Sequence, residues 1–231
     1  MSNAPPPKWL MIATIAMGLI AAASATVWLT LRQPQTSPAG LPQERSGGPG
    51  TPAELDPSLA RFNIPEFALV DQDGNAVDHT LFEGEHTVVS FVFTNCPFVC
   101  PGMTAAMARL QDELADTNAR FVSISVDPER DTPEALRAFA ERYGADGETW
   151  RFLTGDEAEM QKVAGSLGMV VQDDPSTPIE LDDGSEMLNI IHPSRLLLIG
   201  PERQLLGLWT FNDRQALAEL EATVRSLTGG R

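Results

Sequence analysis

The chain has 231 residues, with 32 acidic residues against 16 Lys and Arg. Its formal net charge of -16 argues against nucleic acid and anionic lipid surfaces as partners, because both repel an acidic protein. Two cysteines allow one intramolecular disulfide at most, and a domain of this length does not need a single bridge for stability. We therefore expect Cys96 and Cys100 to have a chemical role rather than to form a disulfide that only stabilises the fold.

The N-terminal part begins with a short tail, residues 1–8, followed by an uncharged apolar stretch over residues 9–31. That stretch is long enough to cross a bilayer as a helix, and we expect it to be a transmembrane anchor. The alternative is a cleaved signal peptide, because Ala23-Ser24-Ala25 resembles a cleavage site, although the apolar run continues beyond it. Lys8 and Arg32 flank the stretch, so the positive-inside rule does not fix its orientation. We expect the C-terminal domain on the extracytoplasmic, periplasmic side of a bacterial inner membrane.

Residues 32–61 are rich in Pro, Gly, Ser and Gln, a composition that cannot bury enough apolar surface to fold. They are predicted to be a flexible linker, and residues 62–228 to be one domain. At the entrance to the domain, EFALVDQDGNAV has two short apolar runs around Asp73-Gly74, which predicts a hairpin.

Residues 87–93, TVVSFVF, form a nearly continuous β-branched and aromatic run, which is typical of a strand buried on both faces. This strand leads directly to Cys96. After it, GMTAAMARLQDELAD has helical spacing. Its apolar face holds Met103, Met107, Leu110 and Leu114.

The rest of the domain continues the alternation of strands and helices. RFVSISVD at residues 120–127 predicts a buried strand, and Thr132 and Pro133 predict the cap and first turn of a helix. Further strands are predicted at WRFL, RLLLIG and QLLGLWTF, and further helices at DEAEMQKVAGSLG and after Asp213. The pattern predicts a thioredoxin-like α/β fold, a mixed sheet flanked by helices.

Cys96 and Cys100 are four residues apart, which puts their side chains on one face if the intervening turn is helical. Pro97 and Pro101 indicate that the regular helix begins around Cys100. A helix N-terminus favours the thiolate, which is both a nucleophile and a ligand for soft metals. A thiol/disulfide exchange centre and a metal site are both open at this point. A merely structural bridge is the third reading, and it would contribute little because the loop that it closes is short.

The histidines separate the metal site from the exchange centre. His79 and His86 fall in a polar segment and receive no role. His192 stands directly before Pro193 and a buried-looking strand. Spacing alone favours a structural role for such a histidine. As a ligand it would complete a set of two thiolates and one imidazole, which suits copper(I) better than structural zinc, because structural zinc takes four protein ligands.

Three segments, FVFTNCPFVCPGM, FVSISVDPERDTPEAL and IIHPSRLLLIG, resemble the Sco/SenC proteins, copper-binding factors for cytochrome oxidase assembly, over residues 62–228. The resemblance implies that Cys96, Cys100 and His192 bind copper, as Cu(I) or Cu(II). It also implies delivery to the binuclear copper centre of the copper-bearing oxidase subunit, or reduction of that subunit's cysteines. Expected partners are that subunit, other copper chaperones and thioredoxin-like reductants.

Two residues depart from the family pattern. Phe98 stands where the family often has an acidic residue, and Ile191 replaces an aspartate that commonly precedes the histidine. Both changes remove carboxylates near the expected metal, and one of these carboxylates would have oriented the imidazole. The alternative function is therefore an extracytoplasmic thiol-disulfide oxidoreductase without a metal role. A peroxidase is disfavoured, because the first cysteine lacks the PxxxTxxC context.

Other residues near these motifs are expected to be structural. Asp127 and Asp131 fall between a strand end and a helix start, where aspartate serves turns and caps. Met103 and Met169 are expected to fill the core. Pro193, directly after the histidine, is compared with the cis-proline that thioredoxins place opposite their dithiol, where it helps to position substrate.

Overall fold

The computed structural model describes residues 51–181 and 183–229. The predicted tail, residues 1–8, and the predicted anchor, residues 9–31, lie outside the described residues, as does most of the predicted linker, residues 32–61. Within the described part of the chain, no helix is long and apolar enough to cross a membrane.

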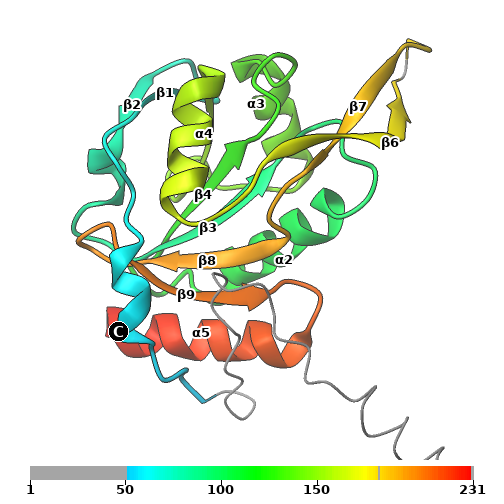
Figure 1. Ribbon diagram of the computed structural model, residues 1–231. Helices are drawn as coiled ribbons and strands as arrows, with labels where there is room; N and C mark the ends of the chain where they lie inside the picture. Colours follow the sequence, from blue (N-terminus) through cyan, green and yellow to red (C-terminus); the bar gives the residue numbers. More distant parts are fainter. Residues whose placement is uncertain (1–50, 182, 230–231) are drawn as a thin grey trace, which may run out of the picture. The chain divides into compact units, whose positions relative to one another are not determined.

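The core of the domain is a seven-stranded sheet in the order β2-β1-β5-β4-β3-β8-β9 (Figure 1). Its strands are β1 (Ala68–Asp71), β2 (Ala76–Asp78), β3 (Thr87–Val92), β4 (Arg120–Ser125), β5 (Trp150–Gly155), β8 (Arg195–Ile199) and β9 (Leu205–Thr210). The pairs β3–β4 and β4–β5 are parallel, and the other pairs are antiparallel. The mixed α/β sheet predicted from the sequence is confirmed.

β3 lies inside the sheet, and all six of its residues are buried. Its neighbours are β4 on one side and β8 on the other, which explains why its sequence is apolar without alternation. The helix α2 (Cys100–Glu113) packs on β3, and α5 (Arg214–Thr228) packs on α2 and β9. The remaining helices are α3 (Pro133–Arg142), α4 (Glu157–Ser166) and the short η1 (Pro57–Arg61) and η2 (His79–Phe82). In Figure 1, α2 lies behind β8, and α4 lies on the face toward the viewer.

The predicted turn and cap residues make the expected contacts. β1 and β2 form a hairpin, and Gly74 in its turn has φ 79°, a conformation that favours glycine. The Thr132 hydroxyl accepts a hydrogen bond from the Ala135 amide at the start of α3. Asp213 accepts one from the Gln215 amide at the start of α5. These local signals were sufficient to predict where the elements begin.

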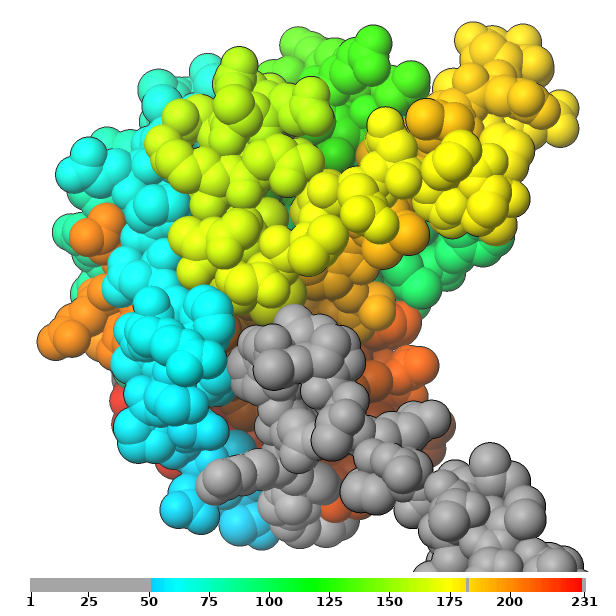
Figure 2. Space-filling view, in the orientation of Figure 1, coloured from blue at the N-terminus to red at the C-terminus, as the bar shows by residue number. Residues whose placement is uncertain are grey.

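The sequence analysis did not predict the two strands β6 and β7. β6 (Gln172–Glu180) and β7 (Glu186–Ile191) pair antiparallel as a separate two-stranded sheet. This hairpin, called the β6–β7 hairpin below, projects from the body of the domain (Figures 1 and 2). Most of its residues are polar and exposed, so it lacks the apolar run that identified the other strands. Ile179 and Met187 are its buried apolar residues.

Two phenylalanines, one in β3 and one in the loop between β3 and α2, give a matched test of the packing of the core. Phe91 in β3 is fully buried, whereas the side chain of Phe98 is 60% exposed. We expect Phe91→Ala to lower the free energy of unfolding by about 3–5 kcal/mol, because it leaves a cavity in the core. Phe98→Ala should change it by about 0.5 kcal/mol or less. Urea unfolding of the full chain, followed by circular dichroism, measures both, and equal effects would contradict the placement of these side chains.

Candidate metal centre

Strand β3 and helix α2 position the two cysteines at their junction. Cys96 lies in the loop between them, and its amide donates to the Phe93 carbonyl at 3.2 Å. Cys100 is the first residue of α2, as the prolines of the loop predicted. Both cysteines are free thiols; Cys96 is 6% exposed and Cys100 is fully buried. The pair is therefore held at a helix N-terminus with only a small opening to solvent.

His192 reaches the cysteines because β8 pairs antiparallel with β3. The register aligns Val89 with Leu197, and because the strands run antiparallel, the segment that precedes β8 and contains His192 lies at the end of β3 from which the cysteine loop departs. The Nε2 atom of His192 lies 3.5 Å from the Cys100 Sγ atom. The ligand atoms of Cys96, Cys100 and His192 all lie within 4.8 Å of one another, and no other such group of three exists among the described residues. The structure thus brings together all three residues that the sequence singled out.

The imidazole of His192 is oriented by its own segment. Its Nδ1 atom lies 3.2 Å from the Pro193 carbonyl, which can only accept a hydrogen bond, so Nδ1 carries the proton and donates. The Nε2 atom is therefore directed to the sulfur atoms. The ring of Phe93 packs edge-on against the imidazole, with the two ring centroids 5.6 Å apart. A backbone carbonyl thus orients the imidazole in this chain, where Ile191 has replaced the aspartate that commonly precedes the histidine in the family.

Pro193 differs from the thioredoxin cis-proline with which it was compared, because its peptide bond is trans. None of the described residues has a cis peptide bond. The trans form is the favoured one even before proline. Pro193 contributes its carbonyl to the site instead.

The two thiols have very different affinities for protons. The hydrogen bond from the Cys100 thiol lowers the pKa of Cys96 to about 4, and His192 and the amides of Cys100 and Phe98 add to this effect against the opposing effect of burial. The same hydrogen bond, together with burial, raises the pKa of Cys100 far above its usual range. At neutral pH the metal-free pair therefore holds one thiolate, on Cys96, and one thiol, on Cys100.

Asp131 connects the loop after β3, which carries Cys96, to the end of β4. The sequence alone predicted only a turn or capping role for it. It is fully buried, and it accepts hydrogen bonds from the Thr94 amide at 3.1 Å, the Thr94 hydroxyl at 2.5 Å and the Ser125 hydroxyl at 2.6 Å. Burial raises the pKa of Asp131 to about 6. Its charge also helps to raise the pKa of Cys100. The structural role is confirmed, and the contact with the loop two residues before Cys96 is what the sequence did not reveal.

The other candidates have no part in the site. Asp127 pairs with Arg130 at 2.9 Å. Met103 is fully buried and Met169 is 8% exposed, so both are core residues as predicted. His79 lies 3.9 Å from Glu83 on the surface.

Phe98 and Ile191, the two departures from the family pattern, face outward beside the cysteines. Their side chains are 60% and 46% exposed. Both line a hollow of about 350 Å³, called the thiol hollow below, together with Cys96, His192 and Ile190. They therefore border the opening through which a molecule reaches Cys96.

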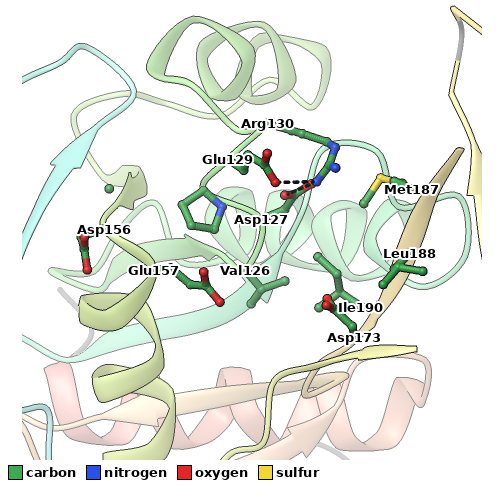
Figure 3. Close-up of a pocket in the computed structure, with 12 residues that line it drawn as sticks. Val126, Asp127, Glu129, Arg130, Asp156, Glu157, Asp173, Met187, Leu188 and Ile190 are labelled. Carbon is green, nitrogen blue, oxygen red and sulfur yellow. Dashed lines mark hydrogen bonds and ion pairs between the residues drawn. The ribbon is translucent and has the colours of Figure 1, made fainter. Parts of the chain in front are cut away.

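A second hollow, called the acidic hollow below, lies between the ends of β4 and β5 and the β6–β7 hairpin (Figure 3). Its volume is about 530 Å³. The acidic residues that line it are Asp127, Glu129, Asp156, Glu157 and Asp173, and its one basic residue is Arg130. No cysteine or histidine lines the acidic hollow, so it takes no direct part in the thiol chemistry.

The three converging groups fit a soft metal ion. Two sulfur atoms and one imidazole nitrogen, without a disulfide between the sulfurs, form a low-coordinate set that suits copper. A structural zinc site would need a fourth ligand. The same dithiol, with one thiolate and one thiol, is also competent for disulfide exchange.

Comparisons with known proteins agree on one family. The family model described as SCO1/SenC matches residues 56–228. The SCO1 protein homolog of Bacillus subtilis is 34% identical over 148 residues, which cover 63% of this chain and 72% of that protein. The structure of ScoI from Bradyrhizobium japonicum with copper bound is 27% identical, with a TM-score of 0.54, covering 68% of this chain and 96% of that one. BsSco, described as a member of the Sco family of cytochrome c oxidase assembly proteins with a disulfide switch, is 28% identical, with a TM-score of 0.59, covering 78% of this chain and 100% of that one.

The proton distribution in the dithiol predicts a specific titration. In reduced, metal-free protein, the ultraviolet absorbance of thiolate should show one group that ionises near pH 4. Cys100→Ala should move this midpoint upward, because it removes the hydrogen bond that lowers the pKa of Cys96 most, and His192→Ala should move it upward by less. Cys96→Ser should abolish the transition. Two thiols that both ionise at about pH 8.5 would contradict the coupled pair.

Proposed function

This chain belongs to the SCO1/SenC family, and we propose that it binds copper and delivers it to the binuclear copper centre of cytochrome c oxidase during assembly. The observation that carries the proposal is the convergence of Cys96, Cys100 and His192, whose ligand atoms lie within 4.8 Å of one another. The copper-bound structure of the relative ScoI supports copper as the cargo.

The residues of the site suit the loading of such a cargo. The Cys96 thiolate needs no deprotonation at neutral pH, whereas Cys100 must release its proton as the metal enters. The His192 Nε2 atom offers its lone pair, because Nδ1 donates to the Pro193 carbonyl. Copper, as Cu(I) or Cu(II), supplies the charge that makes two thiolates stable side by side. Asp131 adds a buried negative charge behind Cys100, which partly replaces the carboxylates that are missing at positions 98 and 191.

Release of the cargo depends on access. Cys96 and His192 line the thiol hollow, so the sulfur or imidazole ligands of an acceptor can approach the metal from that side. A site with three protein ligands leaves room for such an entering ligand, and the ion can pass across by stepwise exchange. We propose that other copper chaperones supply the copper and that the copper-bearing oxidase subunit receives it.

Membrane attachment is also part of the proposal. Residues 9–31 carry no charge and are long enough to span a bilayer, and residues 32–61 have the composition of a flexible spacer up to η1, which begins at Pro57 and buries Leu59. Such an arrangement would hold the domain on the periplasmic side of a bacterial inner membrane, near a membrane-bound oxidase.

Copper(I) titration of the reduced protein against a competing chelator tests the copper role. We expect one equivalent to bind tightly, Cys96→Ser to abolish tight binding, and His192→Ala to weaken it by roughly 10- to 100-fold or more, because one of three ligands is lost. His79→Ala is the matched control, since His79 lies outside the site, and it should bind like the parent protein. Binding that is unchanged by His192→Ala would contradict the assignment.

A second function, reduction of the acceptor's disulfide, is favoured by the coupled protons of the dithiol. The Cys96 thiolate attacks one sulfur of the acceptor disulfide, the S–S bond breaks, and a mixed disulfide forms while the other acceptor sulfur leaves as a thiolate. Cys100 then gives up its proton and attacks the Cys96 sulfur, which releases the second acceptor thiol. The acceptor gains two electrons, the Cys96–Cys100 pair becomes a disulfide, and a thioredoxin-like reductant must restore it.

The metal-free protein allows this second function to be tested alone. We expect it to reduce a peptide disulfide, Cys96→Ser to be inactive, and Cys100→Ser to stop at the mixed disulfide, which mass spectrometry detects. Exchange no faster with the parent protein than with Cys96→Ser would remove the reductase function and leave the copper role untouched.

A further inference from the structure

Large apolar side chains are exposed next to the reactive thiol. Among the described residues, the exposed large hydrophobic side chains are those of Phe98, Val170, Leu188, Ile191 and Leu227. Phe98 and Ile191 lie on separate segments and meet at the thiol hollow, beside Cys96 and His192. Exposed apolar side chains that gather around a hollow mark an interaction site, and aromatic side chains contribute most to such contacts.

Phe98 also borders a hollow on its other side. This α3 hollow, of about 610 Å³, is lined by residues 94–98, by Ala135 and Ala138 of α3, and by Pro178 and Ile179 of β6. Its charged residues are one basic and one acidic, Arg142 and Glu180, so it favours neither charge. Cys96 and Phe98 line both the thiol hollow and the α3 hollow. A chain segment that crosses Phe98 would therefore extend into both hollows, with the Cys96 sulfur beneath it.

The surroundings of this apolar centre are acidic. The β6–β7 hairpin and its turn, residues 172–191, contain no Lys or Arg in the sequence. They contain the acidic residues Asp173, Asp174, Glu180, Asp182, Asp183 and Glu186. The acidic hollow shares Ile190 with the thiol hollow. In Figure 3, Asp156 and Glu157 approach the acidic hollow from the body of the domain, and Asp173 approaches it from the hairpin.

We propose that Phe98, Ile191 and the acidic hollow together form a docking surface for a cysteine-bearing polypeptide segment. The segment has an apolar residue beside its cysteine and a Lys or Arg close by. The apolar residue packs on Phe98 and Ile191, and the basic side chain enters the acidic hollow. This inference rests on the proposed function, because the docked cysteine is the group that receives copper or electrons.

The charge of the surface separates this occupant from others. An anionic lipid surface and an acidic small thiol are both repelled by the acidic hollow and the hairpin. A second copy of this chain carries the same formal charge of -16, so two such faces repel each other. A basic segment is attracted instead, and this attraction weakens as salt screens it.

The apolar contact is tested with the reduced full chain in detergent. The probe is a labelled peptide with one serine in place of its cysteine, a leucine beside that serine and two lysines nearby, so that binding is measured without any chemistry. We expect the double variant Phe98→Ala, Ile191→Ala to bind this peptide about tenfold more weakly, from the loss of two interface contacts. Val170→Ala is the matched control, because Val170 is 65% exposed and does not line the three hollows, and it should bind like the parent chain.

The charge contact is tested by neutralising the acidic hollow. Asp173→Asn with Glu157→Gln should weaken binding of the lysine peptide several-fold at low salt and leave a peptide with serines instead of lysines unaffected. Glu148→Gln, an exposed acidic residue that does not line the three hollows, is the control for general charge.

Failure of this docking surface is distinguishable from failure of the proposed function. Copper(I) affinity and the exchange rate with a small neutral disulfide should be unchanged in the Phe98→Ala, Ile191→Ala variant, because neither residue is a ligand. Peptide binding equal to that of Val170→Ala would overturn the docking surface even if copper binds as proposed. A change from dimer to monomer in this variant, measured by light scattering, would also overturn it, because the surface would then be a contact between copies of the chain.

Discussion

The antiparallel pairing of β3 with β8 is the constraint on which the site depends. It aligns Val89 with Leu197, so the segment that precedes β8, which contains His192, lies at the end of β3 where the cysteine loop begins. Both strands are buried in the middle of the sheet, so their apolar side chains fix the register. A slip by one residue would turn His192 to the other side and expose core residues to water. The three proposed metal ligands are thus positioned by the same packing that stabilises the domain.

Within that frame, one shared proton sets the chemistry of the cysteines. Cys96 is a thiolate because Cys100 is a thiol that donates to it, and each state depends on the other. Entry of a cation displaces the shared proton, whereas a disulfide is attacked by the thiolate that the proton stabilises. The proposed metal binding and the proposed disulfide exchange therefore begin from one state of the same pair. Which of the two occurs depends on what enters the thiol hollow.

Local sequence patterns were sufficient to predict most of the fold. The buried run of β3, the start of α2 at Cys100 and the caps at Thr132 and Asp213 are all properties of short segments. The β6–β7 hairpin has no such signal, because its polar strands are stabilised by pairing with each other and by few buried apolar residues. Its turn around Gly184, with φ 81°, is the one local feature that could have indicated it.

The candidate site was only partly predictable, because its long-range contacts have no local signal. The spacing of Cys96 and Cys100 indicated a dithiol, but His192 is 92 residues away from Cys100 and became a ligand only through the family resemblance. Asp131 was expected only in a turn or cap. Its hydrogen bonds to Thr94 form because the parallel strands β3 and β4 end at the same edge of the sheet, which brings the segments after them together. The role of the Pro193 carbonyl could not be predicted at all. Every residue has a backbone carbonyl, and only the folded geometry shows which one contacts the His192 Nδ1 atom.

The two departures from the family pattern change meaning once they are placed in the structure. From sequence, Phe98 and Ile191 were losses of charge near a metal. In the structure their side chains face solvent, the imidazole is oriented without an aspartate, and the charge of a buried carboxylate, Asp131, helps to raise the pKa of Cys100. The groups that hold a metal are therefore intact, and the substitutions alter the surface that a partner meets. In the proposed docking surface the partner meets an apolar contact at this point, while the acidic hollow favours a basic side chain nearby. We therefore interpret the two substitutions as acting on partner specificity rather than on the three groups proposed to hold the metal.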